Sequence, residues 1–372
     1  MIQSGVARPL TVILDLTERC NLKCVMCYFS TTDRLRFPPY EAALSDDGNM
    51  PIPVFERIAA EYFPRAWRVA LGCATEPMMH PRFSEIVAIA GRYGVPDLWF
   101  PTNLLALTEA SAEAIVRANV NIVGASVDGM TKETYEKIRV GGKWDRLLSK
   151  LQLLRDTKRA LRRKRPNIRV IFTWMKSNRA ELRDLPAFAA DHGATELDVR
   201  YVSPTAGVDN TPELLSGEDP GELRAELAAT ARDAVRRGLR LASYPEFETK
   251  EDRPHDLFGR LAHRLWLMKA GIDRLEYRRH ARQERRAGCG YPDKTFVIRP
   301  NGAIYPCIFW DEQPLGLLPT ETLVSVSSGE PLRQIREALK AGQPIGTCAR
   351  CSERRDAFYR PNLVERLKAA LR

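Results

Sequence analysis

Three cysteines within a short loop constrain this chain more than any other feature of its sequence. Cys20, Cys24 and Cys27 are spaced C-x3-C-x2-C and follow a short apolar run at residues 10–16. Structural zinc sites usually take four ligands arranged as spaced pairs, which this triplet does not match. Three thiolates can instead hold three irons of a cubane iron–sulfur cluster and leave the fourth iron open to another ligand. The triplet therefore predicts a cluster with one exchangeable position.

Length and composition are those of a globular protein. The 372 residues suffice for one large domain with an appendage, and no apolar run approaches the roughly 20 residues that a membrane span needs. The N-terminal stretch lacks the apolar region of a secretory signal, so we expect a cytoplasmic protein with no membrane partner. In a reducing compartment, grouped cysteines more often hold metals than form disulfides.

The formal charge of +10 favours acidic partners such as phosphates or carboxylates. Basic residues concentrate in two stretches, 155–165 and 260–286, and the second also carries apolar residues at helical spacing. This pattern is typical of the solvated faces of amphipathic helices. Because no recognised binding motif accompanies the charge, nucleic acid is not an expected partner.

Short apolar runs alternate with helical patterns as far as about residue 203, which predicts repeated βα units and a parallel sheet. The expected strands are 10–16, 67–72, 97–101, 120–127, 168–175 and 196–202, and the expected helices lie near 53–63, 81–93, 108–118, 132–138, 145–163 and 179–192. Six such units predict an α/β fold, either a partial (β/α)6 TIM barrel or an open curved sheet, and the partial barrel is the fold we expect. Ligands should then gather at the carboxyl ends of the strands.

The pattern changes after residue 203. Residues 204–220 have the composition of a surface loop, and helices are expected at 221–238, 256–286 and 330–341. Asn301-Gly302 lies inside an alternating stretch and predicts a hairpin turn. The predicted domains are a barrel at 1–205, a helical linker or insertion at 206–286, a cysteine-bearing domain at 287–358 and a C-terminal helix at 359–372.

The cysteine triplet, with Tyr28 after its last cysteine, resembles the cluster loop of radical S-adenosylmethionine (SAM) enzymes. The resemblance implies a [4Fe–4S] cluster on the three cysteines whose open iron binds SAM. It also implies that an electron from this cluster splits SAM into methionine and a 5′-deoxyadenosyl radical, which abstracts hydrogen from a substrate carbon. An external electron donor such as flavodoxin or ferredoxin follows from the same resemblance.

Two later strand ends extend the resemblance. The stretch GCATEP, residues 72–77, is similar to the family's Gly-Gly-Glu-Pro motif, which implies that Gly72, Thr75 and Glu76 receive the methionine ammonium. Thr75 replaces the second glycine of that motif. Asn103 lies where the family often has Thr-Asn-Gly, here without the glycine. The alternatives are a helix N-terminal acid for Glu76 and a turn residue for Asn103.

The fourth and sixth strand ends supply further candidates. Ser126 and Asp128 resemble the segment that hydrogen-bonds the SAM ribose and carboxylate, and Arg139 resembles the basic residue that pairs with the methionine carboxylate. A helix cap or turn acid is the alternative for Asp128. Tyr201 and Val202 are candidate adenine contacts, although a buried core position is the usual role of apolar residues in such a strand.

A second set of cysteines lies in the C-terminal part: Cys289, Cys307, Cys348 and Cys351. Four thiolates suit either one cubane cluster or one zinc ion. The pattern C-x12-G-x4-C after a radical SAM domain resembles the start of a SPASM or twitch domain. With four cysteines, the set is similar to the one-cluster twitch form of 2-deoxy-scyllo-inosamine dehydrogenases. That resemblance implies an auxiliary [4Fe–4S] cluster with no open iron and an electron-transfer role.

These cofactors together favour an oxidoreductase that dehydrogenates an alcohol of a sugar, a cyclitol or another specialised metabolite. Arg200 is a candidate for helping to deprotonate the alcohol, with substrate phosphate binding or solvent exposure as alternatives. Cys73 is a candidate hydrogen-atom donor, and its alternative is a small buried hydrophobic residue. The competing hypotheses are a maturase that crosslinks or epimerises a ribosomally made peptide, and a zinc-stabilised binding protein. The expected substrate is therefore a small molecule, which the basic charge allows to be anionic, or a peptide.

Overall fold

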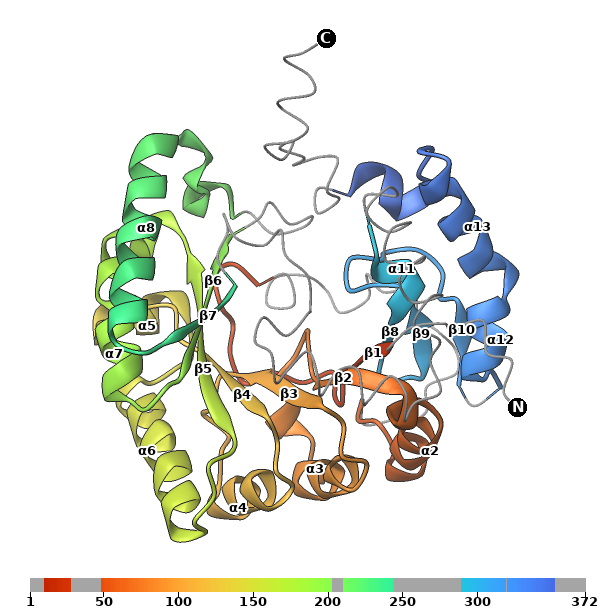
Figure 1. Cartoon of the computed structure of the whole chain (residues 1–372), viewed down its shortest axis with the longest axis horizontal. Coiled ribbons are helices and arrows are strands. Elements are labelled where there is room, and N and C mark those ends of the chain that lie inside the picture. The colour runs from red at the N-terminus through yellow and green to blue at the C-terminus, as the bar shows by residue number, and fades with distance from the viewer. Residues whose placement is uncertain (1–9, 28–47, 203–209, 244–288, 319, 352–372) are drawn as a thin grey trace.

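One curved ten-stranded sheet organises the protein (Figure 1). The computed structural model describes residues 10–27, 48–202, 210–243, 289–318 and 320–351. The strand order is β10-β9-β8-β1-β2-β3-β4-β5-β6-β7. Neighbours from β1 to β7 pair in parallel, and β8 pairs in parallel with the other edge of β1. The last three strands are antiparallel to one another, so a C-terminal hairpin extends the sheet of the barrel.

The strands expected before residue 203 are confirmed, with ends that differ by a few residues. These six strands are β1 (Leu10–Leu14), β2 (Ala66–Leu71), β3 (Asp97–Thr102), β4 (Ile122–Ser126), β5 (Asn167–Trp174) and β6 (Glu196–Tyr201). The later strands are β7 (Arg240–Ser243), β8 (Thr295–Ile298), β9 (Ala303–Tyr305) and β10 (Gly316–Leu317). The predicted hairpin turn at Asn301-Gly302 connects β8 to β9. The fold is therefore the expected α/β type with a hairpin added at its β1 edge.

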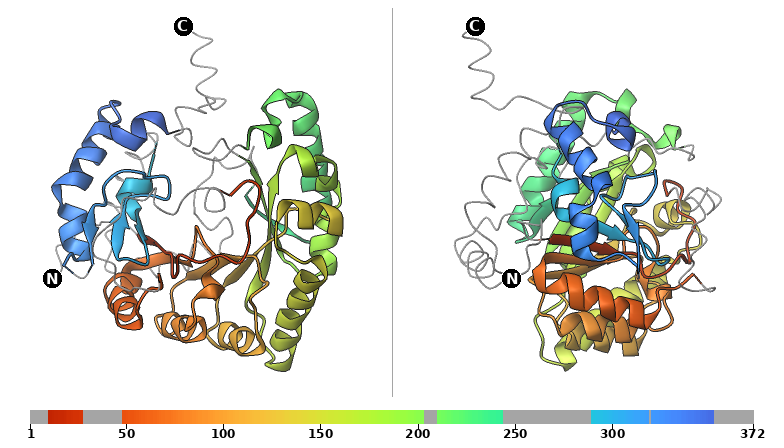
Figure 2. Two further views of the ribbon diagram at one scale, coloured as in Figure 1. Left: turned by 180° about the vertical axis from the view of Figure 1, so that it is seen from behind. Right: turned by 90° about the vertical axis from the view of Figure 1, so that its right-hand side faces the viewer.

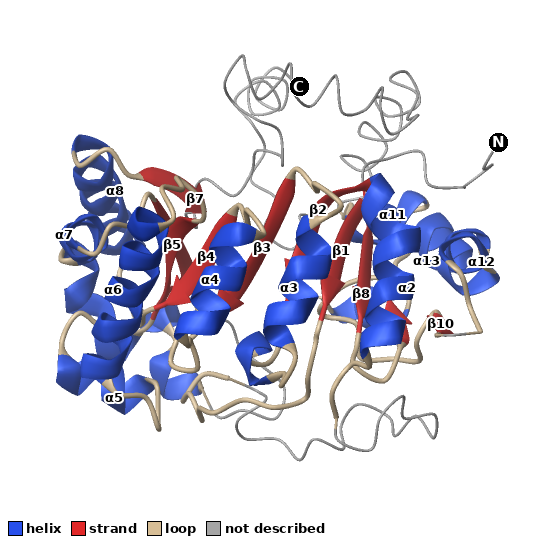
Figure 3. Cartoon of the chain, turned by 90° about the horizontal axis from the view of Figure 1, so that it is seen from below, coloured by secondary structure: helices blue, strands red, loops and turns tan. Residues whose placement is uncertain are grey.

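Helices follow most strands and cover one face of the sheet. The α-helices are α2 (Ile52–Tyr62), α3 (Phe83–Gly91), α4 (Glu109–Arg117), α5 (Lys132–Ile138), α6 (Trp144–Ala160), α7 (Leu185–Asp191), α8 (Pro220–Arg236), α11 (Tyr291–Lys294), α12 (Leu323–Ser328) and α13 (Glu330–Lys340). Figure 3 shows α2, α3, α4 and α6 side by side against the sheet. Among the described residues, none of the helices has the length and apolar character needed to cross a membrane.

Two details differ from the sequence expectation. The helix expected at 179–192 is divided into a 3-10 helix, η4 (Lys176–Arg183), and α7, because Pro186 in the first turn of α7 cannot continue a preceding helix. The segment expected to be helical, 206–286, also contains the four-residue strand β7, which pairs with β6. The expected helices at 256–286 and 359–372 lie outside the described residues.

Side chains along each strand divide between the helix-covered core and the opposite face. In β6, Leu197 and Val199 belong to the core, whereas Asp198 and Arg200 lie on the other face of the strand. The same core continues into the C-terminal hairpin through Phe296 of β8, whose ring meets Tyr62 of α2 edge-on at 6.1 Å. The barrel and the C-terminal part therefore share one hydrophobic core.

We expect Phe296→Ala to destabilise the whole protein, because Phe296 is fully buried between the barrel and the hairpin. Truncation of a buried phenylalanine costs about 3–5 kcal/mol of unfolding free energy. Urea unfolding measures the loss, and Phe309→Ala is the matched control, since Phe309 lies in the same C-terminal part but is exposed. Equal losses in the two variants would contradict a shared core at Phe296.

Candidate iron–sulfur and SAM site

The cysteine triplet lies in the loop that leaves the carboxyl end of β1. Backbone bonds fasten this loop to the chain after α5: Val25 N donates to Ile138 O at 3.0 Å, and Lys23 N donates to Val140 O at 2.9 Å. Val25 and Met26 also pack against a small apolar cluster that contains Ile138, Met175 and Val202. Figure 2 shows the red segment passing from β1 across the open side of the sheet. The loop is therefore fixed at both flanks of Cys24.

The three thiols of the loop lie close enough to influence one another. Burial raises the pKa of the Cys24 thiol to about 11; Arg139 opposes this rise, and Cys27 and Cys20 add to it. Burial also raises the pKa of Cys20. Cys24 is buried, Cys27 is half-buried and Cys20 is exposed. Three gathered soft donors with one exposed side fit a cluster that keeps one iron accessible.

Glu76 lies in a tight turn beside this loop. Gly72 has φ +129°, and a Cβ there would approach the ring of Pro77 to 3.2 Å, so the turn requires glycine. Glu76 is buried, and burial raises its pKa. Its carboxylate accepts from Thr102 Oγ1 at 2.6 Å, from Asn103 N at 2.7 Å and from Met78 N at 3.2 Å. Glu76 thus caps η3 (Pro77–Met79) and links the ends of β2 and β3.

Thr75 and Asn103 connect these strand ends to the cysteine loop. Thr75 Oγ1 donates to Thr17 O at 2.6 Å. Asn103 Nδ2 donates to Asn21 Oδ1 at 2.8 Å, while Asn103 Oδ1 accepts from Leu105 N at 3.0 Å. Asn103 therefore stabilises a turn, as the alternative interpretation proposed, and holds the loop between Cys20 and Cys24.

Asp128 follows β4 and is paired with Arg139. Its side chain is fully buried and forms an ion pair with Arg139 at 2.6 Å. Its second oxygen accepts from Thr173 N at 2.7 Å. Thr131, not Asp128, caps α5. Ser126, at the end of β4, is only partly buried. The resemblance implied that Asp128 contacts the SAM ribose and carboxylate. In the structure, its carboxylate pairs with Arg139 and accepts a hydrogen bond from Thr173.

Tyr201 and Val202 differ in their exposure. Tyr201 is exposed and stacks on Trp174 with a centroid distance of 5.5 Å. Val202 is buried in the small cluster that supports the cysteine loop. Tyr28 lies outside the described residues. Of these two residues, Tyr201 has the exposed side chain, so it is the one available to contact an adenine ring.

Cys73 lies at the mouth of the barrel with its side chain accessible, so the alternative of a buried hydrophobic residue does not hold. Desolvation, together with Asp15, nevertheless raises the pKa of the Cys73 thiol to about 12. Arg299 and Arg200 both lower that pKa, so both guanidinium groups lie near the thiol. Arg200 is half-exposed and pairs with the buried Asp198 at 2.6 Å.

The second cysteine set also comes together. Burial raises the pKa of Cys307 to about 12, and Cys289, Cys348 and Cys351 each add to this rise. Cys289, Cys307 and Cys348 contact an apolar cluster that includes Trp310. By donor chemistry, four cysteines fit either a cubane cluster or zinc. Within the part of the chain that the structure describes, no three His, Cys, Asp or Glu side chains are arranged to hold a single metal ion.

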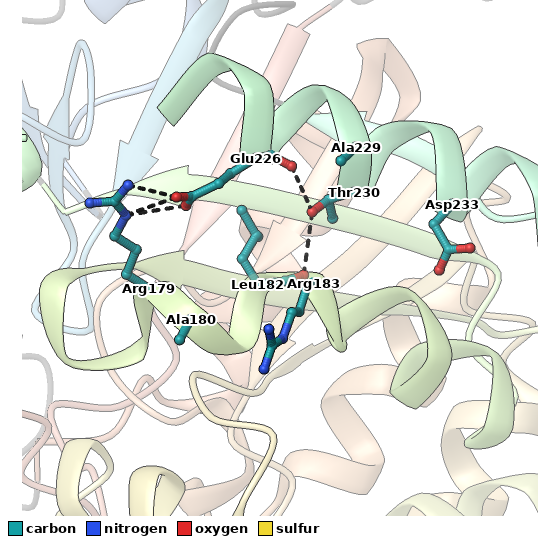
Figure 4. A pocket seen from close by; sticks show the side chains of 8 residues that line it. All are labelled: Arg179, Ala180, Leu182, Arg183, Glu226, Ala229, Thr230 and Asp233. Atoms are coloured by element: carbon teal, nitrogen blue, oxygen red, sulfur yellow. Dashed lines mark hydrogen bonds and ion pairs between the residues drawn. The ribbon is translucent and has the colours of Figure 1, made fainter. Parts of the chain in front are cut away.

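A groove outside the strand ends is also present on the described residues. It has a volume of about 490 Å³ and runs between η4 and α8 (Figure 4). Arg179 pairs there with Glu226 at 2.6 Å, and Thr230 donates to Glu226 O at 3.0 Å. None of the site residues expected from the sequence lines this groove. The site is therefore assigned to the strand ends instead.

Family comparisons match two parts of the chain. A model described as the radical SAM superfamily matches residues 14–161, and one described as an iron–sulfur cluster-binding domain (SPASM) matches residues 289–352. The two matches contain all seven grouped cysteines. They agree with the two sets that the structure gathers.

Curated relatives match over part of their length. A GTP 3′,8-cyclase of Listeria welshimeri is 29% identical over 140 residues, which are 37% of this chain and 39% of the relative. The mycofactocin maturase MftC of Mycobacterium tuberculosis is 28% identical over 193 residues, which are 52% of this chain and 45% of the relative. The chain thus spans less than half the length of these curated relatives.

Solved structures share the fold. Streptococcus suis SuiB bound to S-adenosylmethionine superposes with a TM-score of 0.64 at 16% identity, over 88% of this chain and 67% of SuiB. The structure of anSMEcpe with bound AdoMet gives a TM-score of 0.59 at 15% identity, over 88% of this chain and 82% of anSMEcpe. The α/β architecture is therefore the one seen in these two proteins.

We expect Asp15→Asn to destabilise the protein and loosen the site. Asp15 accepts from the backbone N–H groups of Cys73 and Ala74 and pairs with the buried Arg299. Loss of one partner of a buried ion pair costs about 3–5 kcal/mol, since the other charge stays buried. Urea unfolding measures this cost. Asp145→Asn, which breaks an exposed pair with Lys132, is the matched control and should change little. A similar small change in Asp15→Asn would contradict the role of the buried pair.

Proposed function

The chain carries a radical SAM domain and a SPASM iron–sulfur domain, and we propose that it oxidatively modifies a peptide substrate. The radical SAM domain implies a [4Fe–4S] cluster and SAM, and the SPASM domain implies an auxiliary iron–sulfur cluster. When bound, these groups supply a radical that can remove a hydrogen atom from a C–H bond and an acceptor for the electron that remains. The chain's own residues hold these groups and place the substrate.

The first group of residues would hold the cluster and SAM. We infer that Cys20, Cys24 and Cys27 ligate the first cluster. The SAM-binding surface is then formed by the strand-end residues Gly72, Thr75, Glu76, Asn103, Ser126 and Tyr201, with Asp128, Arg139 and Val202 in supporting positions. The buried Glu76 carboxylate supports this assignment, since it lies next to the loop and is fixed by three hydrogen bonds. A fixed acceptor orients an ammonium group well.

One observation carries the proposal that the reaction is an oxidation. The second set has four cysteines, Cys289, Cys307, Cys348 and Cys351, which could supply all four ligands of an auxiliary cluster and would leave it no position for a substrate. Such a cluster suits electron transfer. The overall change would remove one hydrogen atom, one electron and one proton from the substrate, which is a two-electron oxidation for each SAM cleaved.

A peptide is the substrate class that the comparisons favour. A maturase is among the sequence relatives, and SuiB and anSMEcpe have been crystallised with peptides, so this fold can accommodate one. The comparisons give no support to a sugar or cyclitol alcohol, which the sequence analysis placed first. Crosslinking and epimerisation of a peptide both begin with the same removal of hydrogen from carbon.

The mouth of the barrel offers candidate groups for the substrate side. We propose that the accessible Cys73 thiol contacts the substrate. A hydrogen-atom donor at this position would return a hydrogen atom to the substrate radical and give a redox-neutral epimerisation in place of the oxidation. Arg200 is half-exposed at the same place and is fixed by Asp198. Because arginine stays protonated, Arg200 suits hydrogen bonding to a substrate oxygen better than it suits proton removal.

Anaerobic reconstitution tests the proposed cofactors. We expect about eight irons per chain, which is two [4Fe–4S] clusters, and formation of 5′-deoxyadenosine with SAM and dithionite. Cys24→Ala should lose about half of the iron and all 5′-deoxyadenosine. Cys307→Ala should also lose about half of the iron but still cleave SAM. If the wild-type protein contained zinc in place of half of the expected iron, and Cys307→Ala lost that zinc, the auxiliary cluster would be contradicted.

Deuterium transfer tests the substrate class. A perdeuterated peptide digest should place deuterium in 5′-deoxyadenosine, since the hydrogen removed from the substrate ends there. Perdeuterated glucose and inositol serve as the alcohol probes. Deuterium from an alcohol but from no peptide would overturn the peptide proposal and return the alcohol dehydrogenase hypothesis to first place.

A further inference from the structure

We propose that Arg139 acts on the sulfur of Cys24 and thereby sets the reduction potential of the first cluster. This inference rests on the proposed function, since it requires a [4Fe–4S] cluster on the cysteine triplet. It differs from the role that the radical SAM resemblance implies for Arg139, which is to pair with the methionine carboxylate.

The contacts of the Arg139 guanidinium point to this role. Its Nε donates to Asp128 Oδ2 at 2.7 Å, and its Nη2 lies 2.6 Å from the same oxygen. Its Nη1 lies 3.8 Å from Cys24 Sγ, within hydrogen-bond range for sulfur. One edge of the guanidinium is thus held by a carboxylate, and another nitrogen is directed at a cluster ligand.

Asp128 is a rigid support for this arrangement. Thr173 N donates to its Oδ1 at 2.7 Å. Asn178 Nδ2 donates to the backbone oxygens of both Asp128 and Thr173, at 3.0 and 2.8 Å. The Asp128 side chain is fully buried and that of Arg139 is 12% exposed, so the pair is screened little by solvent. The position of the guanidinium is therefore set by the ends of β4 and β5.

The backbone on either side of Arg139 holds the same loop. Ile138 O accepts from Val25 N, and Val140 O accepts from Lys23 N. These two bonds flank Cys24 in the sequence, so Arg139 and Cys24 face each other between them. Arg139 ends α5 with φ −93° and ψ 63°, outside the helical region, and its own N–H donates to Tyr135 O at 2.8 Å. The backbone hydrogen bonds of the loop therefore hold the Arg139 guanidinium and the Cys24 sulfur next to each other.

The physical consequence concerns the charge of the cluster. Reduction adds one negative charge, and hydrogen bonds to the sulfurs together with nearby positive charge stabilise the reduced form. Arginine keeps its charge at all working pH values, so this stabilisation does not titrate away. Removal of the guanidinium should therefore shift the potential of the first cluster to more negative values.

The test is an EPR-monitored redox titration of the reconstituted holoprotein without SAM. The first cluster is identified as the signal that SAM addition changes. In Arg139→Gln we expect the reduction equilibrium of this cluster to shift at least tenfold toward the oxidised form, which is 59 mV for one electron. The auxiliary cluster should not change. Arg139→Lys, which keeps the charge, should shift less, and Arg117→Gln on the exposed surface of α4 is the control.

A double variant separates the contact from the charge. Asp128→Asn with Arg139→Gln keeps the net charge of the wild type but removes the N–H contact to sulfur. A shift that persists in this variant supports the contact, and a return to the wild-type potential overturns it. If Arg139→Gln does not assemble the first cluster, the reduction potentials of Arg139→Lys and of the double variant decide whether the guanidinium contact sets the potential.

A second measurement distinguishes the carboxylate role. An unchanged SAM-free potential in Arg139→Gln, with weaker binding of SAM but unchanged binding of decarboxylated SAM, would overturn the proposal and assign Arg139 to the methionine carboxylate. Absence of any [4Fe–4S] signal in the wild-type protein would instead contradict the proposed function itself.

Discussion

The buried carboxylate of Asp15 joins the three parts on which the site depends. It follows β1 and immediately precedes the cysteine loop. Its oxygens accept from the backbone of Cys73 and Ala74 after β2 and pair with Arg299 after β8. Its own N–H donates to Ile298 O at 3.0 Å. One side chain therefore fixes the start of the cluster loop, the turn that carries Glu76, and the hairpin of the auxiliary domain. Charge pairs of this kind are costly to break inside a protein, so this pair ties the chain after β1 firmly to the chain after β8.

The cysteine loop contains no regular secondary structure of its own and is held by its neighbours. Asn103 fixes Asn21, Thr75 fixes Thr17, and the chain on both sides of Arg139 fixes Lys23 and Val25. These partners come from the ends of β2 and β3 and from the chain after α5. A loop secured at so many points keeps its thiols gathered before any metal arrives, which lowers the conformational entropy lost on cluster assembly. The strand ends therefore contribute to the cluster site by holding the cysteine loop in place.

Local patterns made much of this architecture predictable, and long-range pairing accounts for what they missed. The six strands, the hairpin at Asn301-Gly302 and both cysteine sets follow from periodicity, turn chemistry and spacing. The Asp15–Arg299 pair joins residues 284 positions apart, which no local pattern encodes. The resemblance of residues 126–129 to a SAM-binding segment implied that Asp128 contacts the ribose and carboxylate of SAM. The orientation of Asp128 depends on Thr173 of β5 and on Arg139, and only the assembled sheet shows it. The strand β7 was not predicted, because four residues are too few to show a clear alternation of apolar and polar side chains.

Charge on the open face of the sheet bears on which substrates the site suits. The net charge of +10 suggested an anionic partner. At the mouth, however, each of three arginines meets a buried aspartate: Arg139 with Asp128, Arg200 with Asp198, and Arg299 with Asp15. Deeper in the barrel, Arg169 is paired with the buried Glu196. Among the described residues, these pairs present oriented donors and acceptors at fixed positions. Such groups suit recognition by hydrogen bonding, which is consistent with the peptide substrate that we propose.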